Sequence, residues 1–269
     1  MTQDIKNLKD AVARNWNRNA DQWAVDVSGG LDLYRDLFTW PEFESFLGDV
    51  RDLDVIDFGC GEGTNTRRLA RSGAHMTGID LASGMVAKAQ AAEKADPLGI
   101  TYHVGSFSDP TSFDDGSFDR VISTLALMDG PDLPGAMREA YRLLRPGGEI
   151  VFSVLHPCHF SPSGLRWAWT KDRTVAGLII GKYHDRQPRT EQWQFERQKD
   201  APTPSRPFEI MRFPRTLADW INAVTDAGLV LTRLEEPVPS EAAIARYPIL
   251  ERWRDHAAFL LLLRARRPH

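Results

Sequence analysis

Hydrophobic and polar positions follow a helical spacing in the first fifty residues of the chain. Apolar residues recur every three or four positions over residues 4–24, which predicts one or two amphipathic helices. Ser28-Gly29-Gly30 interrupts this pattern, and a second helical pattern covers residues 32–47. Pro41 falls early in that second pattern, where a first-turn proline is well tolerated. The N-terminal segment is therefore expected to be helical.

Short apolar runs alternate with helical patterns in the rest of the chain. Between residues 51 and 155, strands are expected over 53–58, 75–80, 100–104, 118–124 and 149–155, and helices over 64–71, 83–95 and 133–144. After residue 215, the pattern predicts helices over 216–227 and 241–254 and strands over 229–234 and 257–264. Strands that alternate with helices predict a parallel sheet with right-handed crossovers.

Residues 156–214 interrupt this alternation. The segment is rich in proline, arginine and aromatic residues, and only residues 190–197 alternate weakly, as an exposed strand would. About 58 residues thus separate two core elements where two to six would suffice. We predict an N-terminal helical cap (1–50), an α/β core (51–155 and 215–269) and an insert (156–214). The insert is expected to be a substrate lid, with an oligomer contact or a solvated face as the alternative.

Composition excludes several classes of protein. The chain has 269 residues, 42% hydrophobic and 26% charged, which suits one large domain or two small ones. The longest fully apolar run, Ala257–Leu263, is far shorter than the ~20 residues that a membrane-spanning helix needs, so no membrane partner is expected. The polar first twenty residues do not resemble a signal peptide. With only Cys60 and Cys158, a disulfide scaffold is excluded and a reducing, cytoplasmic location is expected.

The formal net charge of −4 conceals an uneven distribution. Residues 166–215 hold eleven Lys/Arg against six Asp/Glu, a local balance of +5, so the rest of the chain carries −9. An acidic chain does not favour nucleic acid as a partner, whereas the basic insert suits an acceptor with a carboxylate, phosphate or phenolate. The insert also contains Trp167, Trp169, Tyr183 and Trp193, which are expected to line an apolar substrate pocket.

A glycine-rich loop follows the first predicted strand. Residues 57–63 read Asp-Phe-Gly-Cys-Gly-Glu-Gly, and such glycines allow a tight turn and the close approach of a ligand. Asp80 ends the next strand, where a carboxylate can accept hydrogen bonds from both hydroxyls of a ribose. A dinucleotide fingerprint would need glycine where Thr64 stands, and Asp57 and Glu62 would repel a pyrophosphate. S-adenosylmethionine (SAM) reverses that argument, because it carries a sulfonium and an ammonium and no phosphate.

Four segments resemble the motifs of the class I SAM-dependent methyltransferases, in particular the small-molecule, type 11-like branch. They cover residues 55–63, 78–85, 115–123 and 144–148, in the family's order and at its spacing. The resemblance implies an α/β, Rossmann-like fold with a seven-stranded, mostly parallel sheet of order 3-2-1-4-5-7-6, in which strand 7 is antiparallel. It also implies an enzyme that moves a methyl group from SAM to a small organic acceptor by direct displacement, leaving S-adenosyl-L-homocysteine. Oxygen is the first expected acceptor atom, with carbon or nitrogen next.

The resemblance also implies roles for individual positions. Twelve are expected at the cofactor: Asp57, Gly59, Cys60, Gly61, Gly63, Asp80, Leu81, Met85, Ser106, Phe107, Thr124 and Leu125. The loop glycines and Asp57 would hold the methionine part of SAM, with Cys60 structural within that loop, and Asp80 would bind the ribose. Leu81 and Met85 would pack on the adenine. Ser106 departs from the family, which often has an aspartate there that contacts the adenine amino group.

Candidate catalytic residues follow the fourth and fifth strands, at the sheet edge where ligands of such folds bind. His156 is the first candidate general base, followed by His159, and the alternative is that His156 packs within its loop. Asp129 would either position an acceptor or cap the next loop. In the N-terminal segment, Trp16, Trp23, Tyr34 and Arg35 would close over SAM, with Arg35 meeting its carboxylate. The alternative is that the two tryptophans bury a helix on the core.

Other types of site and activity fit the sequence less well. The histidine and cysteine spacing at residues 156–159 does not match a zinc site, so no metal is expected. An NAD-linked oxidoreductase is disfavoured by Thr64 and Asp57, and an RNA methyltransferase by the lack of an Asn-Pro-Pro-Tyr-like motif after the fourth strand. A protein that binds SAM without transferring its methyl group is not excluded. The expected partner is a small-molecule substrate, and a homodimer is an open alternative.

Overall fold

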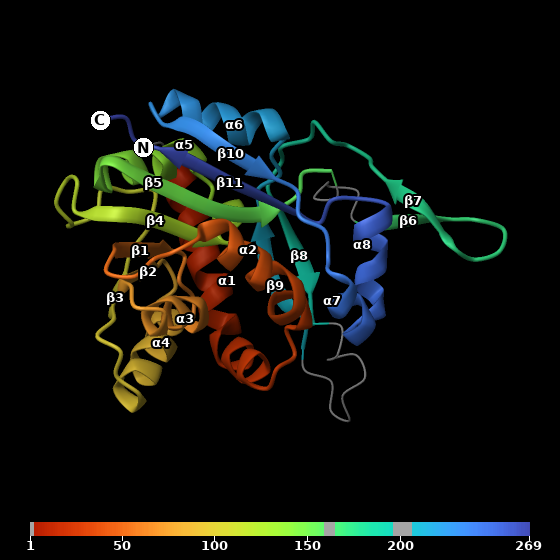
Figure 1. Ribbon diagram of the computed structural model, residues 1–269, viewed down its shortest axis with the longest axis horizontal. Coiled ribbons are helices and arrows are strands. Elements are labelled where there is room, and N and C mark those ends of the chain that lie inside the picture. The colour runs from red at the N-terminus through yellow and green to blue at the C-terminus, as the bar shows by residue number, and fades with distance from the viewer. Residues whose placement is uncertain (1–2, 159–164, 196–205) are drawn as a thin grey trace.

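A seven-stranded sheet runs through the centre of the structure (Figure 1), a computed structural model that describes residues 3–158, 165–195 and 206–269. Its order is β3-β2-β1-β4-β5-β11-β10. The strands are β1 (Asp54–Phe58), β2 (His75–Asp80), β3 (Thr101–Val104), β4 (Phe118–Thr124), β5 (Leu144–Leu155), β10 (Val230–Glu235) and β11 (Leu260–Arg266). Strand β11 is antiparallel to β5 and β10, and the other neighbours pair in parallel. The predicted fold class and strand order are confirmed.

Helices cover both faces of this sheet. They include α3 (Thr64–Arg71), α4 (Ser83–Ala95), α5 (Leu133–Leu143) and α6 (Leu217–Asp226), all close to their predicted bounds. Because successive strand residues point to opposite faces, Ile56 packs in a cluster with residues of α5 and α6, while Val55 packs with residues of α3 and α4. In the part of the chain that the structure describes, each helix is too short or too polar to cross a membrane.

The N-terminal segment forms α1 (Gln3–Ser28), a π-helical turn, η1 (Arg35–Thr39), and α2 (Trp40–Leu47). Pro41 lies in the first turn of α2, as expected. Near the other end of the chain, the helix predicted over 241–254 is broken. It consists of α7 (Glu241–Arg246), a 3-10 turn, η4 (Pro248–Leu250), and α8 (Glu251–Asp255), because a proline inside a helix lacks the backbone donor and clashes with the preceding turn.

The described residues of the insert form two antiparallel hairpins. One pairs β6 (Arg166–Trp169) with β7 (Val175–Ile179), and the other pairs β8 (Arg189–Trp193) with β9 (Phe208–Arg212). Figure 1 shows the β6–β7 hairpin projecting from the body, whereas β9 lies beside α1. The β8–β9 hairpin is fastened on two sides: Asn19 of α1 donates a hydrogen bond to the Glu209 carbonyl (2.9 Å), and the Phe213 amide donates to the Met128 carbonyl (3.4 Å).

Candidate active site

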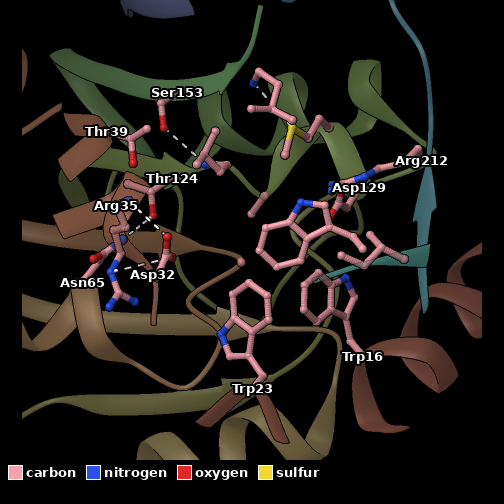
Figure 2. Close-up of a pocket in the computed structure, with 18 of the residues that line it drawn as sticks. Trp16, Trp23, Asp32, Arg35, Thr39, Asn65, Thr124, Asp129, Ser153 and Arg212 are labelled. Carbon is pink, nitrogen blue, oxygen red and sulfur yellow. Dashed lines mark hydrogen bonds and ion pairs between the residues drawn. The ribbon is translucent and has the colours of Figure 1, made fainter. Parts of the chain in front are cut away.

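A cavity of about 430 Å³ lies at the carboxyl ends of the central strands. Parallel registers bring the ends of β1, β2, β4 and β5 to one edge, which is where open α/β sheets bind ligands. The rest of the wall comes from α1, the turn before α2, the β8–β9 hairpin and the C-terminal segment around α8. Figure 2 shows Arg35, Asp32 and Asn65 on one side of this space and the Asp129–Arg212 pair on the other, with Trp23 and Trp16 along the bottom of the view.

The glycine loop packs closely against the end of β2 and the segment after β4. The amides of Gly59 and Cys60 both donate hydrogen bonds to the Ile79 carbonyl, at 2.8 and 3.2 Å, which ties the loop to the end of β2. Gly59 has a φ of +78°, and a Cβ there would collide with the Cβ of Ala126 in the segment after β4. Only glycine combines this left-handed conformation with so close an approach. The loop backbone therefore forms part of the cavity wall.

Asp80 lies on the cavity wall at the end of β2, where it supports the glycine loop. Its two carboxylate oxygens accept hydrogen bonds from the amides of Gly61 (3.0 Å) and Ala82 (2.8 Å). Burial nevertheless raises the pKa of Asp80 to about 6, because the charged form is deprived of water. Each carboxylate oxygen can accept a further hydrogen bond. Two hydroxyl groups of a ribose would supply the missing donors.

Asp57, in β1 at the start of the glycine loop, is buried and does not line the cavity. One carboxylate oxygen accepts a hydrogen bond from the Thr66 hydroxyl (2.7 Å), and the other is buried without a partner among the described residues. Burial raises the pKa of Asp57 to about 7, with Asp80 and Glu62 adding like-charge repulsion. A cation in the cavity would relieve this repulsion. SAM, expected from the sequence, fits these residues because it brings both positive charge and ribose donors.

The N-terminal segment closes over the loop at one point. Trp23 of α1 donates an indole hydrogen bond to Glu62 (2.9 Å), and Arg35 lies 3.9 Å from the other oxygen of the same carboxylate. Asn65, at the start of α3, donates to the Thr124 hydroxyl at the end of β4 (3.0 Å). Arg35 lies beside Asp32 on this side of the cavity (Figure 2). The guanidinium of Arg35 can bind the carboxylate of an amino acid, and the carboxylates of Asp32 and Glu62 can bind its ammonium group.

A chain of alternating charges lines the opposite side. Asp129, after β4, pairs with Arg212 of β9 at 2.5 Å. Arg212 lies 3.3 Å from Glu191 of β8, whose other oxygen is 2.6 Å from Arg189. All four line the cavity. Burial raises the pKa of Asp129 to about 6 even though Arg212 favours its ionised form. The insert and the core thus share a buried polar contact inside the cavity.

Most of the predicted cofactor positions lie together on the wall: Gly59, Cys60, Gly61, Asp80, Leu81, Met85, Ser106, Phe107, Thr124 and Leu125. Asp57 and Gly63 are not on the wall, and a Cβ at Gly63 would collide with the Tyr102 hydroxyl instead. Leu125 has a φ of +54°, and its amide donates to the carbonyl of Ser153 on β5 (3.0 Å), which holds the segment after β4 in place. Of the remaining predicted residues, Tyr34, Arg35, Asp129 and Trp193 also line the cavity.

The expected base His156 is placed elsewhere. Its Nδ1 accepts a hydrogen bond from the Cys158 amide (3.1 Å), and its Nε2 lies 2.7 Å from Glu236. The side chain is not on the cavity wall, and burial lowers its pKa. This supports the alternative that His156 packs within its loop. His159 lies outside the described residues.

Three of the four aromatic residues expected in the substrate pocket do not reach it either. Trp167 packs edge-to-face on Trp253, with ring centroids 5.0 Å apart. Trp169 is 61% exposed, and the Tyr183 hydroxyl accepts a hydrogen bond from the Leu217 amide at the start of α6 (3.0 Å). The physical reason is topological, since all three belong to the β6–β7 hairpin or to the chain just after it, and none of them is on the cavity wall.

Sequence reasoning missed several wall residues: Asp32, Asn65, Ser153, Arg189, Glu191, Arg212 and Arg252. Asn65 could have been found, because it follows the glycine loop by two positions and so begins the helix that faces the ligand. Ser153 could have been found from its place in the fifth strand. The arginines carry no local signal, because only the folded chain brings them to the cavity.

Comparisons with known proteins show that the chain is similar to methyltransferases. Residues 56–152 match the model of a methyltransferase domain family. The crystal structure of a SAM-dependent methyltransferase from Mesorhizobium loti is 30% identical, covers 85% of this chain and 97% of that chain, and superposes with a TM-score of 0.70. A putative SAM-dependent methyltransferase from Listeria monocytogenes, 22% identical with 86% and 98% coverage and a TM-score of 0.67, shares the fold.

Curated relatives match over shorter stretches. A malonyl-[acyl-carrier protein] O-methyltransferase from Erwinia billingiae is 39% identical over 147 residues, which are 55% of this chain and 54% of the relative. A ubiquinone biosynthesis O-methyltransferase from Xanthomonas oryzae pv. oryzae is 36% identical over 108 residues, 40% of this chain and 45% of the relative. The chain thus spans about half the length of these curated relatives.

Proposed function

The chain belongs to the SAM-dependent methyltransferases, and from this premise we propose that it methylates a small organic acceptor held in the cavity. One observation carries the proposal. The glycine loop with Asp80 and the polar pair Asp129–Arg212 line the same cavity, so a cofactor on the first and an acceptor on the second would meet. Oxygen is the acceptor atom we favour, because two curated relatives are named O-methyltransferases.

We assign the cofactor to the residues around the glycine loop. Asp80 would accept hydrogen bonds from the ribose hydroxyls, while Leu81, Met85, Ser106 and Phe107 would surround the adenine. The negative charges of Glu62 and Asp57 would stabilise the cationic part of the ligand. Arg35 would pair with the carboxylate of the methionine portion, beside Thr124 and Leu125.

When bound, SAM supplies a methyl group on a positively charged sulfur. The chain's own contribution is alignment, since holding two reactants in place lowers a barrier substantially without any further chemistry. Asp129 would accept the proton of a hydroxyl acceptor, because a carboxyl of pKa about 6 is ionised at neutral pH. Arg212 would hold Asp129 in position. His156 is not proposed as a base, since it lies off the cavity wall.

We propose the β8–β9 hairpin, rather than the whole insert, as the substrate lid. It contributes Arg189, Glu191, Trp193, Ile210 and Arg212 to the cavity wall, and it is fastened to both α1 and the segment after β4. Such a cover leaves room for a small molecule and supports that class over a folded RNA. The division into cap, core and insert remains our proposal for the chain's organisation.

The affinity for SAM should depend on pH through Asp80. Its pKa of about 6 in the ligand-free protein means that the group is protonated at pH 5, and binding the ribose as a carboxylate must then release that proton. The affinity for SAM should therefore fall as the pH decreases through 6, by about tenfold per pH unit below the pKa. Calorimetric titration at pH 7.5 and 5.0 measures this. Asp80→Asn should lose the part of the dependence centred near pH 6, and an unchanged profile in that variant would contradict the assignment.

Methyl transfer itself is tested by incubating the protein with methyl-labelled SAM and a panel of phenols, carboxylic acids and amines. We expect label in at least one acceptor, with an equivalent amount of S-adenosyl-L-homocysteine formed. Asp80→Asn serves as the matched control. Binding of SAM with no transfer to any acceptor class would favour a non-catalytic binding protein, and saturable binding of NAD would favour an oxidoreductase.

A further inference from the structure

The cavity has a third region, near α8, to which the proposed function gives no role. Its wall is largely aromatic and comes from distant parts of the chain: Tyr34 before α2, Tyr247 and Trp253 around α8, and Phe259 before β11. The rings contact one another, with the Tyr34 and Phe259 centroids 5.0 Å apart and the Trp253 and Phe259 centroids 4.8 Å apart. Arg252 of α8 lines the cavity at this aromatic end.

Arg252 differs from the other cations of the wall. Lys9, Arg35, Arg189 and Arg212 each have a carboxylate within 4.0 Å, at 2.7, 3.2, 2.6 and 2.5 Å respectively. Among the residues that the structure describes, no carboxylate lies within that distance of Arg252. Its Nη2 donates a long hydrogen bond to the Tyr34 hydroxyl (3.4 Å), and its Nε is buried with no hydrogen-bond partner in the described part of the chain.

The surroundings of Arg252 hold the guanidinium in place without neutralising it. The group lies over the rings of Trp167 (5.2 Å) and Trp253 (5.8 Å), contacts that favour a cation but leave its in-plane N–H donors available. A buried donor without an acceptor costs free energy, so a native structure that keeps one usually has a ligand or a function for it. Arginine presents paired donors in a plane, which match the oxygens of a carboxylate or a phosphate.

The other charged side chains of the acceptor region do not offset Arg252. Among the described residues, Asp129, Arg212, Glu191 and Arg189 form ion pairs with one another. The guanidinium of Arg252 has no such carboxylate partner there and is therefore available to an anionic ligand.

We infer that Arg252 binds an anionic group, a carboxylate or a phosphate monoester, on an acceptor whose apolar body lies against Tyr34, Trp253 and Phe259. This inference rests on the proposed function, since it names the acceptor class for the same cavity. The competing explanation is structural: Arg252 would only join α8 to Trp167 of the β6–β7 hairpin. The two explanations differ in whether removing the guanidinium changes the preference for anions or only the stability of the protein.

The test uses benzoate, phenyl phosphate and neutral benzamide as probes of one size class. Each is titrated into protein saturated with S-adenosyl-L-homocysteine, which would occupy the Arg35 region, and the change in tryptophan fluorescence, to which Trp253 contributes, reports binding in the cavity. We expect benzoate or phenyl phosphate to bind about tenfold or more tightly than benzamide, which is the scale of hydrogen bonds to a charged group. The tighter of the two anions identifies carboxylate or phosphate as the group bound.

Arg252→Gln should abolish this preference, and Arg252→Lys should retain part of it, since the charge remains and the planar pair of donors is lost. Arg254→Gln is the matched control, because Arg254 lies on the same helix but pairs with Glu241 and Asp255 at the surface. Equal binding of anions and benzamide to the unaltered protein would overturn the inference, and so would a preference that survives in Arg252→Gln. A calorimetric titration with S-adenosyl-L-homocysteine is separate: its failure would contradict the proposed function, whereas normal binding without anion preference would contradict only the role of Arg252.

Discussion

Replacing Asp80 by alanine is expected to weaken SAM binding at least about 100-fold while leaving the fold intact. The carboxylate lies on the cavity wall, and two ribose hydroxyls would each lose a hydrogen bond to a charged acceptor, worth ~1.5–3 kcal/mol apiece. The protein itself should tolerate the change, because the raised pKa of Asp80 shows that burial already penalises its ionised form in the absence of ligand. Calorimetry measures the dissociation constant, and a urea titration measures the free energy of unfolding.

The matched control for that variant is Asp226→Ala, at the exposed end of α6. It removes the same carboxyl group far from the cavity and should leave SAM binding unchanged. If Asp80→Ala bound SAM as tightly as the unaltered chain, the assignment of the ribose to Asp80 would be wrong. If both affinity and stability collapsed together, the loss would be attributed to the glycine loop, which Asp80 supports through Gly61.

The core elements could be predicted because each carries its own local signal. The strand before Gly59 is rich in apolar residues since it is buried on both faces, and the glycines and Asp80 follow it at a spacing that backbone geometry dictates. The prediction of one helix over 241–254 was wrong in detail. The apolar spacing continues across Pro248, and that spacing alone does not account for the backbone N–H donor that proline lacks.

The acceptor side could not be predicted in the same way. Asp129 and Arg212 are 83 positions apart, and their contact depends on how the β8–β9 hairpin lies across α1 and the segment after β4. His156 was chosen because it follows β5 at the ligand-binding edge, but Glu236 and the Cys158 amide bind its ring nitrogens off the cavity wall. Similarly, the basic and aromatic composition of the insert is shared between two hairpins, only one of which lines the cavity. Composition cannot distinguish the two hairpins, because it does not show which of them folds toward the cavity.

Replacing Arg212 by methionine is expected to lower the free energy of unfolding by ~3–5 kcal/mol, the usual cost of leaving one member of a buried ion pair without its partner. Methionine keeps much of the volume, so the loss is chiefly that of the charge. Without Arg212, the pKa of Asp129 should rise further, because the neighbouring positive charge that favours its ionised form is gone. A carboxyl whose pKa is raised in the folded state contributes stability at low pH, and that contribution is lost as the pH rises. The destabilisation should therefore be larger at pH 8 than at pH 5.

The double variant Asp129→Asn, Arg212→Met separates the lost charge from lost packing. It removes both members of the pair and should recover a good part of the stability that Arg212→Met loses, because no buried charge is then left at Asp129. Urea unfolding of the unaltered chain, of the single variants Asp129→Asn and Arg212→Met and of the double variant, at pH 5 and pH 8, measures the coupling free energy between the two residues. SAM affinity should stay near that of the unaltered chain, since neither residue of the pair is assigned to the cofactor, but methyl transfer should fall in every variant if Asp129 accepts the proton. Equal destabilisation of the single and double variants, with no dependence on pH, would mean that Arg212 stabilises the hairpin by packing and that the pair has no electrostatic part in the active site.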